Sequence, residues 1–280
     1  MRSLLFVPAD SEKKIPKALA STADIVILDL EDSVAAANKP AARALAAEVL
    51  RSNRDRRVYV RVNALDTGLT LDDLTVTLPA KPHGLILPKS TSADAVSRLH
   101  ALIMMIAPGD ETTPVIAIAT ETAASIFHMG SYVNAHPRLE GLNWGMEDLA
   151  AALGAQSNRD EHGEPTEPYR LARTLTLFAA RAAGVAPIDA VYSNFRDAAG
   201  LLKQCREAVR DGFTAKMCIH PDQVGPINEA FTPSTEAIAR ARQIVEAFAA
   251  AGNPGVLAVD GEMLDAPHLK AAQALLRNVS

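Results

Sequence analysis

The sequence has few cysteines, no long apolar run and no signal for export. Its 280 residues contain two cysteines, Cys205 and Cys218, whose spacing fits neither a CxxC motif nor a metal site. So few cysteines disfavour a disulfide framework and favour a reducing compartment. The apolar stretch near the N-terminus is too short for a signal peptide, and no segment approaches transmembrane length without a charge or breaker. We therefore expect a cytoplasmic protein with no membrane partner.

Charge of one sign is not concentrated anywhere along the chain. The formal net charge is -5, the charges are mixed, and no basic tail is present. This balance gives no reason to expect nucleic acid as a partner. No linker rich in Pro, Gly or Ser divides the sequence, and 48% of its residues are apolar, so a chain of this size can bury a large core.

Short apolar runs alternate with Ala-rich amphipathic segments along most of the chain. The predicted strands are 3–8, 24–30, 57–63, 84–89, 114–120, 140–145, 189–194 and 215–220. Near-continuous apolar strands favour a parallel sheet, and eight strand–helix repeats predict a (β/α)8 TIM barrel. A doubly wound sheet is the structural alternative, but the first turn, PADSEKK, lacks a GxGxxG pattern. The barrel is predicted over residues 1–254, followed by an additional C-terminal segment, 255–280.

Polar side chains gather where the predicted strands end, and the active sites of such barrels lie at that face. Few charges stand where the strands begin, and this asymmetry predicts an enzyme. The polar residues at or just beyond the strand ends are Asp10, Asp29, Glu31, Asp32, Arg61, Asn63, Lys89, Thr120, Glu121, Glu147, Asp148, Ser193, Asn194 and His220.

Several carboxylates in this set would repel one another unless a cation lay among them. Carboxylate oxygens are hard ligands and favour Mg²⁺, with Mn²⁺ second, and the scarcity of histidine argues against zinc. Arg61 could hold a substrate carboxylate through two parallel hydrogen bonds. Lys89 could form a Schiff base or neutralise the acids, and the number of acids favours the second role.

Each of these residues also has a structural interpretation. Asp32, Glu121 and Asp148 all stand near expected helix starts, where a carboxylate can cap or stabilise the helix. Arg61 could pair with an acid of strand two, and His220 could be a capping or packing residue. Their joint position at one face of the barrel, rather than any single residue, favours a catalytic site.

Seven motifs in order resemble the citrate lyase β-subunit/malyl-CoA lyase family of the HpcH/HpaI superfamily. They are VILDLEDSV, VRVN, LILPK, ATETAAS, WGMEDLAAALGA, KMCIHPDQV and VDGEMLDAPHLKAA. The resemblance extends over essentially the whole chain and implies a (β/α)8 barrel that binds one Mg²⁺. It also implies cleavage of a carbon–carbon bond in a hydroxyacyl-CoA, such as citryl-, malyl- or citramalyl-CoA, to an acyl-CoA and a 2-oxo acid.

The resemblance assigns roles residue by residue. Glu121 and Asp148 would bind the metal, and Glu121 would also lie against the substrate. Glu31 and Asp32 would orient metal-bound waters, and Asp29 would brace the end of strand two. Arg61 would hold the acyl or oxo-acid end, and Lys89 would neutralise the site. Asp265 would protonate the enolate from a neighbouring subunit, which implies a homo-oligomer, commonly a trimer; as a structural alternative, Asp265 is well placed to cap the last helix.

The expected coenzyme A site is less complete. Relatives often carry an arginine after PAD, whereas this chain has Ser11 followed by Lys13, Lys14 and Lys17. Lysines can bind phosphate as point charges. The family pattern also assigns Phe6 and His220 to substrate binding.

Other functions stay open at this point. A metal-dependent aldolase of free 2-oxo acids is one alternative, but relatives of that kind place a histidine base in the second strand–helix loop, and residues 33–45 contain none. An acyl-CoA thioesterase and a subunit of a multi-chain citrate lyase complex are the other two.

Overall fold

A computed structural model describes residues 1–277 of the chain, which divide into two compact units. The first unit is Met1–Phe231, and the second begins at Thr232. The division lies earlier than the predicted boundary after residue 254, because the helix at 235–250 packs within the second unit. None of the helices described is long and apolar enough to cross a membrane.

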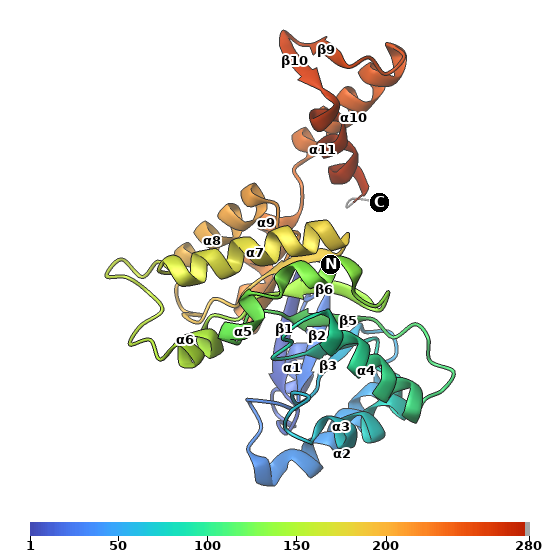
Figure 1. The fold of residues 1–280 in the computed structure, drawn as a ribbon, viewed down its shortest axis with the longest axis vertical. Helices are drawn as coiled ribbons and strands as arrows, with labels where there is room; N and C mark the ends of the chain where they lie inside the picture. Colours follow the sequence, from blue (N-terminus) through green and yellow to red (C-terminus); the bar gives the residue numbers. More distant parts are fainter. Residues whose placement is uncertain (278–280) are drawn as a thin grey trace. The chain divides into compact units, whose positions relative to one another are not determined.

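The first unit is a closed barrel of eight parallel strands, as predicted (Figure 1). Each strand pairs with the next along the chain, and β8 closes the barrel on β1. The strands are β1 (Ser3–Pro8), β2 (Ile25–Asp29), β3 (Val58–Arg61), β4 (Gly84–Leu87), β5 (Val115–Ile118), β6 (Leu139–Asn143), β7 (Ala186–Asp189) and β8 (Ala215–Cys218).

Helices follow the strands and surround the barrel (Figure 1). The α-helices are α1 (Ile15–Leu19), α2 (Lys39–Ser52), α3 (Thr70–Thr77), α4 (Ala93–Ile106), α5 (Ala123–Ile126), α6 (Glu147–Leu153), α7 (Glu167–Ala183), α8 (Ala198–Asp211) and α9 (Val224–Phe231). Short 3-10 helices are η1 (Ala36–Asn38), η2 (Leu78–Ala80), η3 (Met129–Asn134) and η4 (Pro221–Gln223).

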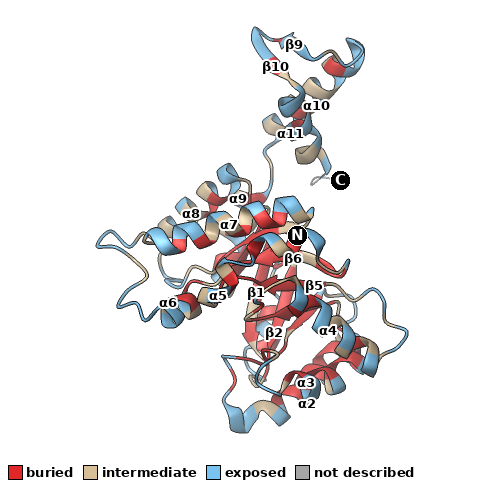
Figure 2. Ribbon diagram, viewed as in Figure 1, coloured by how far each residue is buried: buried red, intermediate tan, exposed pale blue. Residues whose placement is uncertain are grey.

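The barrel strands are largely buried (Figure 2). Side chains that alternate along them belong to two separate buried clusters. In β2, Ile25 and Ile27 belong to the cluster inside the barrel, while Val26 and Leu28 pack in the layer beneath the helices. All four are fully buried, and burial of each such side chain contributes about 1.5–3 kcal/mol. The same alternation directs the next inward residue, Asp29, to the interior at the exit of the strand.

The seventh strand lies earlier in the sequence than predicted. The prediction was 189–194, whereas β7 is Ala186–Asp189. The observed strand includes Pro187, a residue that lacks a backbone donor and is rare inside sheets. Ser193 and Asn194 consequently lie in the loop beyond β7, and Asp189 is the polar residue that ends this strand.

Asp189 is the centre of a buried ionic cluster between the barrel and its helices. Its carboxylate accepts hydrogen bonds from Lys216 Nζ at 2.6 Å and from Trp144 Nε1 at 2.8 Å, and Arg173 Nε lies 3.5 Å away. Burial opposes ionisation of this carboxyl, but the charges of Lys216 and Arg173 outweigh that effect and lower its pKa.

We expect Asp189→Asn to lower the free energy of unfolding at pH 7 by about 3–5 kcal/mol, because Lys216 would be left buried without its counter-ion. Since the pKa of Asp189 is lowered in the folded state, its stabilisation is present above the ordinary carboxyl pKa and is lost as pH falls. Urea unfolding at pH 7 and at pH 3 should therefore show a smaller difference at the lower pH. Asp211→Asn, which alters a surface partner of Arg173, should cost less than about 1 kcal/mol. Equal losses of unfolding free energy in the two variants at pH 7 would contradict the central role of Asp189 in the buried ionic cluster.

The second unit is a helical hairpin joined by two short strands. It contains α10 (Thr235–Ala250), β9 (Val256–Val259), β10 (Glu262–Asp265) and α11 (Ala266–Arg277). The strands β9 and β10 pair antiparallel, and Phe248, Val259 and Leu264 form its small buried core. This core explains why α10 belongs with the C-terminal segment rather than with the barrel.

Candidate active site

The exit of β2 is held by a double hydrogen bond between Asp29 and Arg61. Arg61 Nε donates to Asp29 Oδ1 at 2.7 Å, and Nη2 donates to Asp29 Oδ2 at 2.8 Å. The two residues are partners in the β2–β3 register, and the guanidinium of Arg61 lies 4.8 Å from the ring centre of Phe6. Asp29 also accepts the backbone N–H of Glu31 at 2.9 Å, so it fixes the turn that follows the strand. The expected bracing role of Asp29 agrees with these contacts.

The fork of Arg61 is therefore engaged by a neighbouring acid, which is the structural alternative that the sequence left open. Its third nitrogen, Nη1, lies 3.1 Å from Glu31 Oε2. Burial opposes the charge on both Asp29 and Arg61, but their mutual hydrogen bonds lower the pKa of Asp29 and raise that of Arg61. A substrate carboxylate that binds Arg61 would therefore share the guanidinium with Asp29 and Glu31.

Lys89 connects the acids of β2 with those of β5 and α6. It has a left-handed backbone, with φ of 49°, and its N–H donates to Glu121 Oε2 at 2.5 Å. A non-glycine residue in this region is strained, and such strain is concentrated at functional sites. The ammonium group pairs with Glu31 and lies 3.4 Å from Asp32 Oδ1 and 3.5 Å from Asp148 Oδ1.

These contacts decide between the two roles considered for Lys89. Burial alone would lower its pKa, but the hydrogen bond to Glu31 and the surrounding carboxylates raise it above the usual lysine value. A Schiff-base lysine needs an accessible neutral amine, which this environment disfavours. The arrangement favours neutralisation of the acids by Lys89.

Glu121 follows β5 and is almost fully buried, with 4% of the residue exposed. Burial, together with the charges of Asp148 and Glu31, raises its pKa to about 8. Thr122, rather than Glu121, caps α5 by accepting a hydrogen bond from Ser125 N. A Cβ at Gly145 would lie 2.6 Å from Glu121 Cγ, so the glycine of the WGMED motif makes room for this carboxylate. Glu121 has no capping duty and faces the cluster.

Asp148 and Asp32 are the more exposed acids of the cluster. Asp148 lies in the first turn of α6, where Met146 occupies the N-cap position, and Asp32 caps none of the described helices. Both face the ammonium group of Lys89. Neither residue is an N-cap, although Asp148, in the first turn of α6, also lies where a carboxylate stabilises the helix N-terminus.

The cluster fits one magnesium ion for which protein carboxylates fill only some of the coordination positions. Among residues 1–277, no group of three or more Asp, Glu, His or Cys side chains is arranged to hold a metal. Mg²⁺ binds well to one or two carboxylates when water and substrate supply its other ligands. Glu31 Oε2 is buried and is paired with Arg61 Nη1 at 3.1 Å, but it receives no well-directed hydrogen bond from the described residues, so it can also accept one from a metal-bound water.

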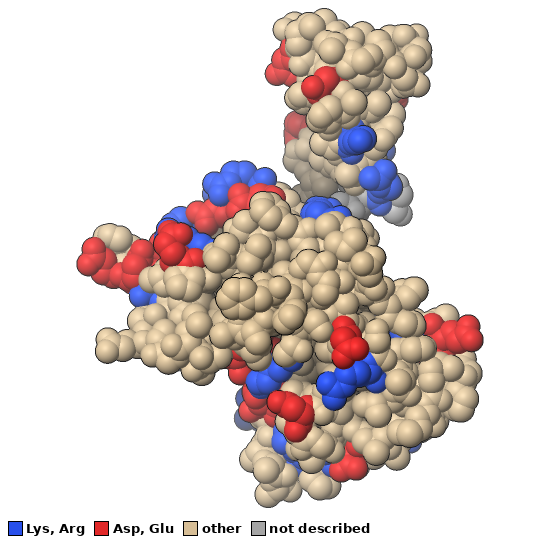
Figure 3. Space-filling view, in the orientation of Figure 1, with Lys and Arg blue, Asp and Glu red and all other residues tan. Residues whose placement is uncertain are grey.

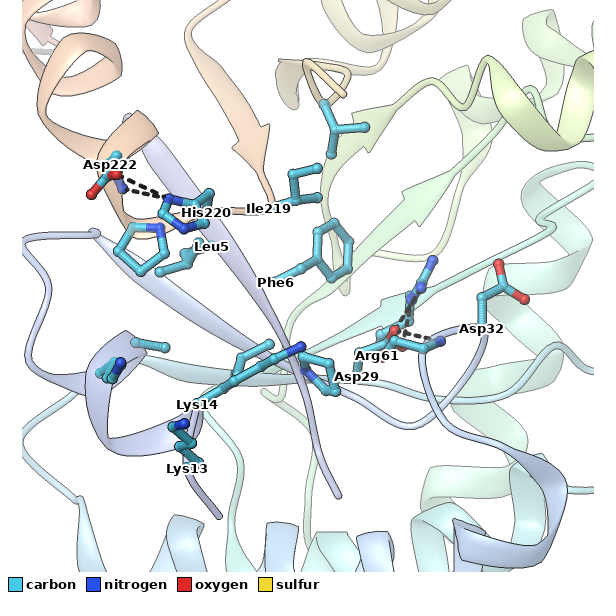
Figure 4. A pocket seen from close by; sticks show the side chains of 17 residues that line it. Leu5, Phe6, Lys13, Lys14, Asp29, Asp32, Arg61, Ile219, His220 and Asp222 are labelled. Carbon is cyan, nitrogen blue, oxygen red and sulfur yellow. Dashed lines mark hydrogen bonds and ion pairs between the residues drawn. The ribbon is translucent and has the colours of Figure 1, made fainter. Parts of the chain in front are cut away.

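A cavity of about 900 Å³ adjoins the cluster at Asp29, Asp32 and Arg61 (Figure 4). Figure 4 shows Phe6 between His220 and Arg61, with Lys13 and Lys14 on another part of the wall. The cavity therefore brings an arginine, a ring of β1 and the basic residues of the first strand–helix loop to one space. It is lined by Leu5, Phe6, Val7, Pro8, Lys13, Lys14, Lys17, Ala18, Asp29, Asp32, Ser33, Arg61, Val191, Ile219, His220, Pro221 and Asp222.

His220 has both of the structural roles considered for it and also lines the cavity. Its Nδ1 accepts the backbone N–H of Asp222 at 3.2 Å, while Gln223 Oε1 accepts the N–H of His220, so the pair forms a capping box for η4. Its ring stacks on Phe195 with centroids 4.6 Å apart. A ring held in this way presents a fixed wall to the cavity.

Sequence reasoning missed three residues near the cluster and cavity. Val191 and Ile219 line the cavity next to Phe6, and Lys39 bonds the backbone of the turn after β2. The apolar pair follows β7 and β8 and carried no polar signal. Lys39 stands in the ordinary helix start NKPAAR, where a lysine has no distinctive pattern.

Asp265 lies in the second unit, at the end of β10 and directly before α11. Its Oδ1 and His268 Nδ1 are 2.5 Å apart, and its backbone N–H is 3.3 Å from the same nitrogen. Both side chains are about half exposed. Asp265 is therefore accessible and has one close polar partner in its own unit.

Comparison with known proteins agrees with this geometry. A family model described as HpcH/HpaI aldolase/citrate lyase matches residues 2–221. The chain belongs to this family. A citrate lyase subunit beta-like protein of Mycobacterium tuberculosis is 38% identical over 275 residues, which cover 98% of this chain and 93% of that protein. The mitochondrial citramalyl-CoA lyase of Rattus norvegicus is 34% identical over 293 residues, covering 98% of this chain and 85% of the relative.

A solved structure of a family member is also similar over nearly the full length. It is the protein CitE of Mycobacterium tuberculosis in complex with magnesium, acetoacetate and coenzyme A, with a TM-score of 0.80 and 35% sequence identity. The match covers 99% of this chain and 97% of that chain. The barrel thus belongs to a family whose members include named carbon–carbon lyases.

Proposed function

We propose that this protein is a Mg²⁺-dependent carbon–carbon lyase that cleaves a hydroxyacyl-CoA to an acyl-CoA and a 2-oxo acid. The observation that supports the proposal most strongly is that two features lie next to each other at the barrel mouth. One is the acid cluster around Lys89, and the other is the adjoining cavity of about 900 Å³ with lysines on its wall. The relatives named for citrate and citramalyl-CoA chemistry support the same reaction class.

In this proposal Glu121 and Asp148 hold the metal. A bound Mg²⁺ supplies Lewis-acid polarisation of the hydroxyl and carboxylate oxygens of the oxo-acid half. Glu31 and Asp32 hold the waters around it, and the positive charge of Lys89 offsets part of the negative charge of the acids. Arg61, positioned by Asp29 and lying against the ring of Phe6, orients the acyl or oxo-acid end, with Nη1 shared between the substrate and Glu31.

Cleavage then requires a proton for the departing fragment. The substrate hydroxyl passes its proton to water at the acid cluster, the bond to the thioester's α-carbon breaks, and the electron pair forms an enolate that takes up a proton at carbon. We assign that proton transfer to Asp265, whose carboxyl is accessible and contacts His268.

We further propose that Asp265 acts at a neighbouring subunit's mouth, with residues 255–280 as the extension that carries it, and that the assembly is a trimer. Large apolar side chains just after α5 and on η3 and α7 support self-association, because Phe127, Val133, Leu171 and Phe178 are each at least half exposed. Figure 3 shows few charged side chains over α5 and α7 on the face that it presents. Exposed apolar surface of this kind is typical of protein interfaces.

The coenzyme A arm is assigned to the cavity. Lys13, Lys14 and Lys17 supply positive charge for phosphates in place of the arginine seen in relatives, and the fixed ring of His220 lies along the opposite wall. Lysines bind phosphate without the two-pronged geometry of arginine, so we expect moderate affinity for the coenzyme.

Replacing Lys13 and Lys14 together by Gln should raise KM for the CoA thioester about tenfold per lost phosphate contact, with kcat changed less. The reason is that these lysines bind a part of the substrate remote from the reacting bond. Initial-rate kinetics would measure the effect, and Lys81→Gln, on the η2 loop, serves as the control. An unchanged KM in the double variant would contradict the assignment of the coenzyme A phosphates to this wall of the cavity.

The reaction class is tested by incubating the purified protein with citryl-, malyl-, methylmalyl- and citramalyl-CoA and with the corresponding free hydroxy acids. A lyase releases a 2-oxo acid and an acyl-CoA in equal amounts from a thioester. Release of free CoA with the hydroxy acid intact would instead identify a thioesterase. Cleavage of the free acids at comparable rates would identify an aldolase of unacylated substrates.

A further inference from the structure

Lys39 makes three hydrogen bonds, two of them to the backbone of the turn that carries Glu31 and one to Asn63. Its ammonium donates to the backbone oxygen of Leu30 at 2.8 Å, to the backbone oxygen of Glu31 at 2.9 Å and to Asn63 Oδ1 at 2.7 Å. These three acceptors use all three protons of a lysine ammonium. The side chain thus joins the first residue of α2 to the ends of both β2 and β3.

The acceptors of Lys39 are themselves anchored. Asn63 Nδ2 donates to Leu30 O at 3.1 Å and to Asp73 Oδ2 at 2.7 Å, and the N–H of Asn63 reaches the same oxygen of Asp73 at 2.7 Å. Arg43, one turn along α2 from Lys39, holds the other oxygen of Asp73 at 2.6 Å. Asn63 and Asp73 are almost fully buried, so the network is rigid and shielded from water.

The peptide of Glu31 is consequently fixed from both sides. Its N–H donates to Asp29 Oδ1, and its carbonyl accepts from Lys39. From these two anchors the side chain places Oε1 against the ammonium of Lys89 and Oε2 3.1 Å from Arg61 Nη1, where Oε2 receives no well-directed hydrogen bond from the described residues. If the turn were held less firmly, the carboxylate of Glu31 could move with the side chain of Lys89 or rotate toward solvent.

We infer that Lys39 is a positioning residue for the metal site, which acts by fixing the backbone from which Glu31 reaches the metal's water shell. The inference rests on the proposed function for its effect on catalysis. Its effect on metal binding can be measured without substrate. Partners that orient the groups around a metal typically contribute about 10–100-fold to metal affinity or activity.

Lys39→Met keeps the length of the side chain and removes the ammonium. We expect Mg²⁺ affinity, measured by titration calorimetry without substrate, to fall about 10–100-fold, and kcat to fall by a similar factor while KM for the thioester changes less than about threefold. Lys39→Arg keeps a cation and several donors, so its losses should be intermediate. Circular dichroism and thermal unfolding of each variant establish that the barrel is folded.

The matched control is Arg54→Gln. Arg54 Nη1 also bonds two backbone oxygens after a helix, those of Ala80 at 2.7 Å and Lys81 at 3.1 Å, but it lies at the η2 loop away from the acid cluster. Its loss should reduce thermal stability by about as much as the loss of Lys39, with Mg²⁺ affinity unchanged. Equal losses of metal affinity in the two variants would assign Lys39 a purely structural role and overturn the inference.

A double-variant cycle with Glu31→Gln separates positioning from general stability. If Lys39 acts through Glu31, the variant carrying both changes should bind Mg²⁺ no more weakly than Glu31→Gln alone. Independent, additive losses would contradict the inference. The Mg²⁺ affinities of the wild type and the variants could follow the expected ranking while none of the proteins cleaves a hydroxyacyl-CoA. That result would contradict the proposed function but would still support the role of Lys39.

Discussion

Asp148→Ala is expected to abolish Mg²⁺-dependent cleavage while leaving the barrel folded. The carboxylate faces Lys89 from the first turn of α6 and is one third exposed, so its removal breaks no buried hydrogen bond that holds the fold. Loss of a metal ligand should lower kcat/KM by at least about 10³-fold, because metal charge stabilisation in a transition state is worth several kcal/mol. Formation of the 2-oxo acid, followed with a coupled dehydrogenase, measures the effect.

The neighbouring acid supplies the control for this variant. Glu147 precedes Asp148 in the same helical turn, and its carboxylate accepts a hydrogen bond from Asn158 instead of facing the cluster. Glu147→Ala should therefore retain wild-type dependence on Mg²⁺. Full activity in Asp148→Ala would show that Asp148 is not a metal ligand.

Asp265→Asn is expected to lower cleavage by about 10²–10⁴-fold, the usual contribution of a general acid. The amide keeps the size of the carboxyl group but cannot give its proton to the enolate. Exchange of the α-hydrogens of the acyl-CoA product with deuterated water should fall together with cleavage, because both steps move the same proton. Mass spectrometry of the recovered acyl-CoA measures this exchange.

Asp260→Asn is the matched control for Asp265, since it changes another acid of the same hairpin. Asp260 pairs with Arg240, and its φ of 51° is tolerated by asparagine. This variant should cleave and exchange at wild-type rates. If exchange continued at the wild-type rate in Asp265→Asn, a different residue would be the acid.

The barrel was predictable because its strands are short, apolar and regularly spaced. Seven of the eight strands lie where the apolar runs indicated, although most end a few residues earlier, because polar residues such as Asn63 and Lys89 continue the chain past the last ladder bond. The strand at Pro187 was misplaced, since a proline in a buried strand contradicts the propensity that the prediction used. The second unit was only partly anticipated, because the amphipathic pattern of α10 does not tell which core it packs against.

The acid cluster was predictable in composition but not in pairing. Strand-end positions correctly brought Glu31, Asp148 and Lys89 together. The engagement of Arg61 by Asp29 depends on the β2–β3 register, which a sequence pattern does not give. The anchoring contacts of Lys39 depend on the position of α2 against the strand exits, and no motif marks them.

The central claim is that Glu121 and Asp148 bind a Mg²⁺ on which cleavage of a hydroxyacyl-CoA depends. Its most direct test is the rate of 2-oxo acid formation by metal-stripped protein as Mg²⁺ is added back, in the wild type and in Asp148→Ala. We predict no cleavage without the metal, a saturable rise to full rate in the wild type, and no rise in the variant. Full cleavage by the metal-stripped wild type in the presence of a chelator would contradict the account.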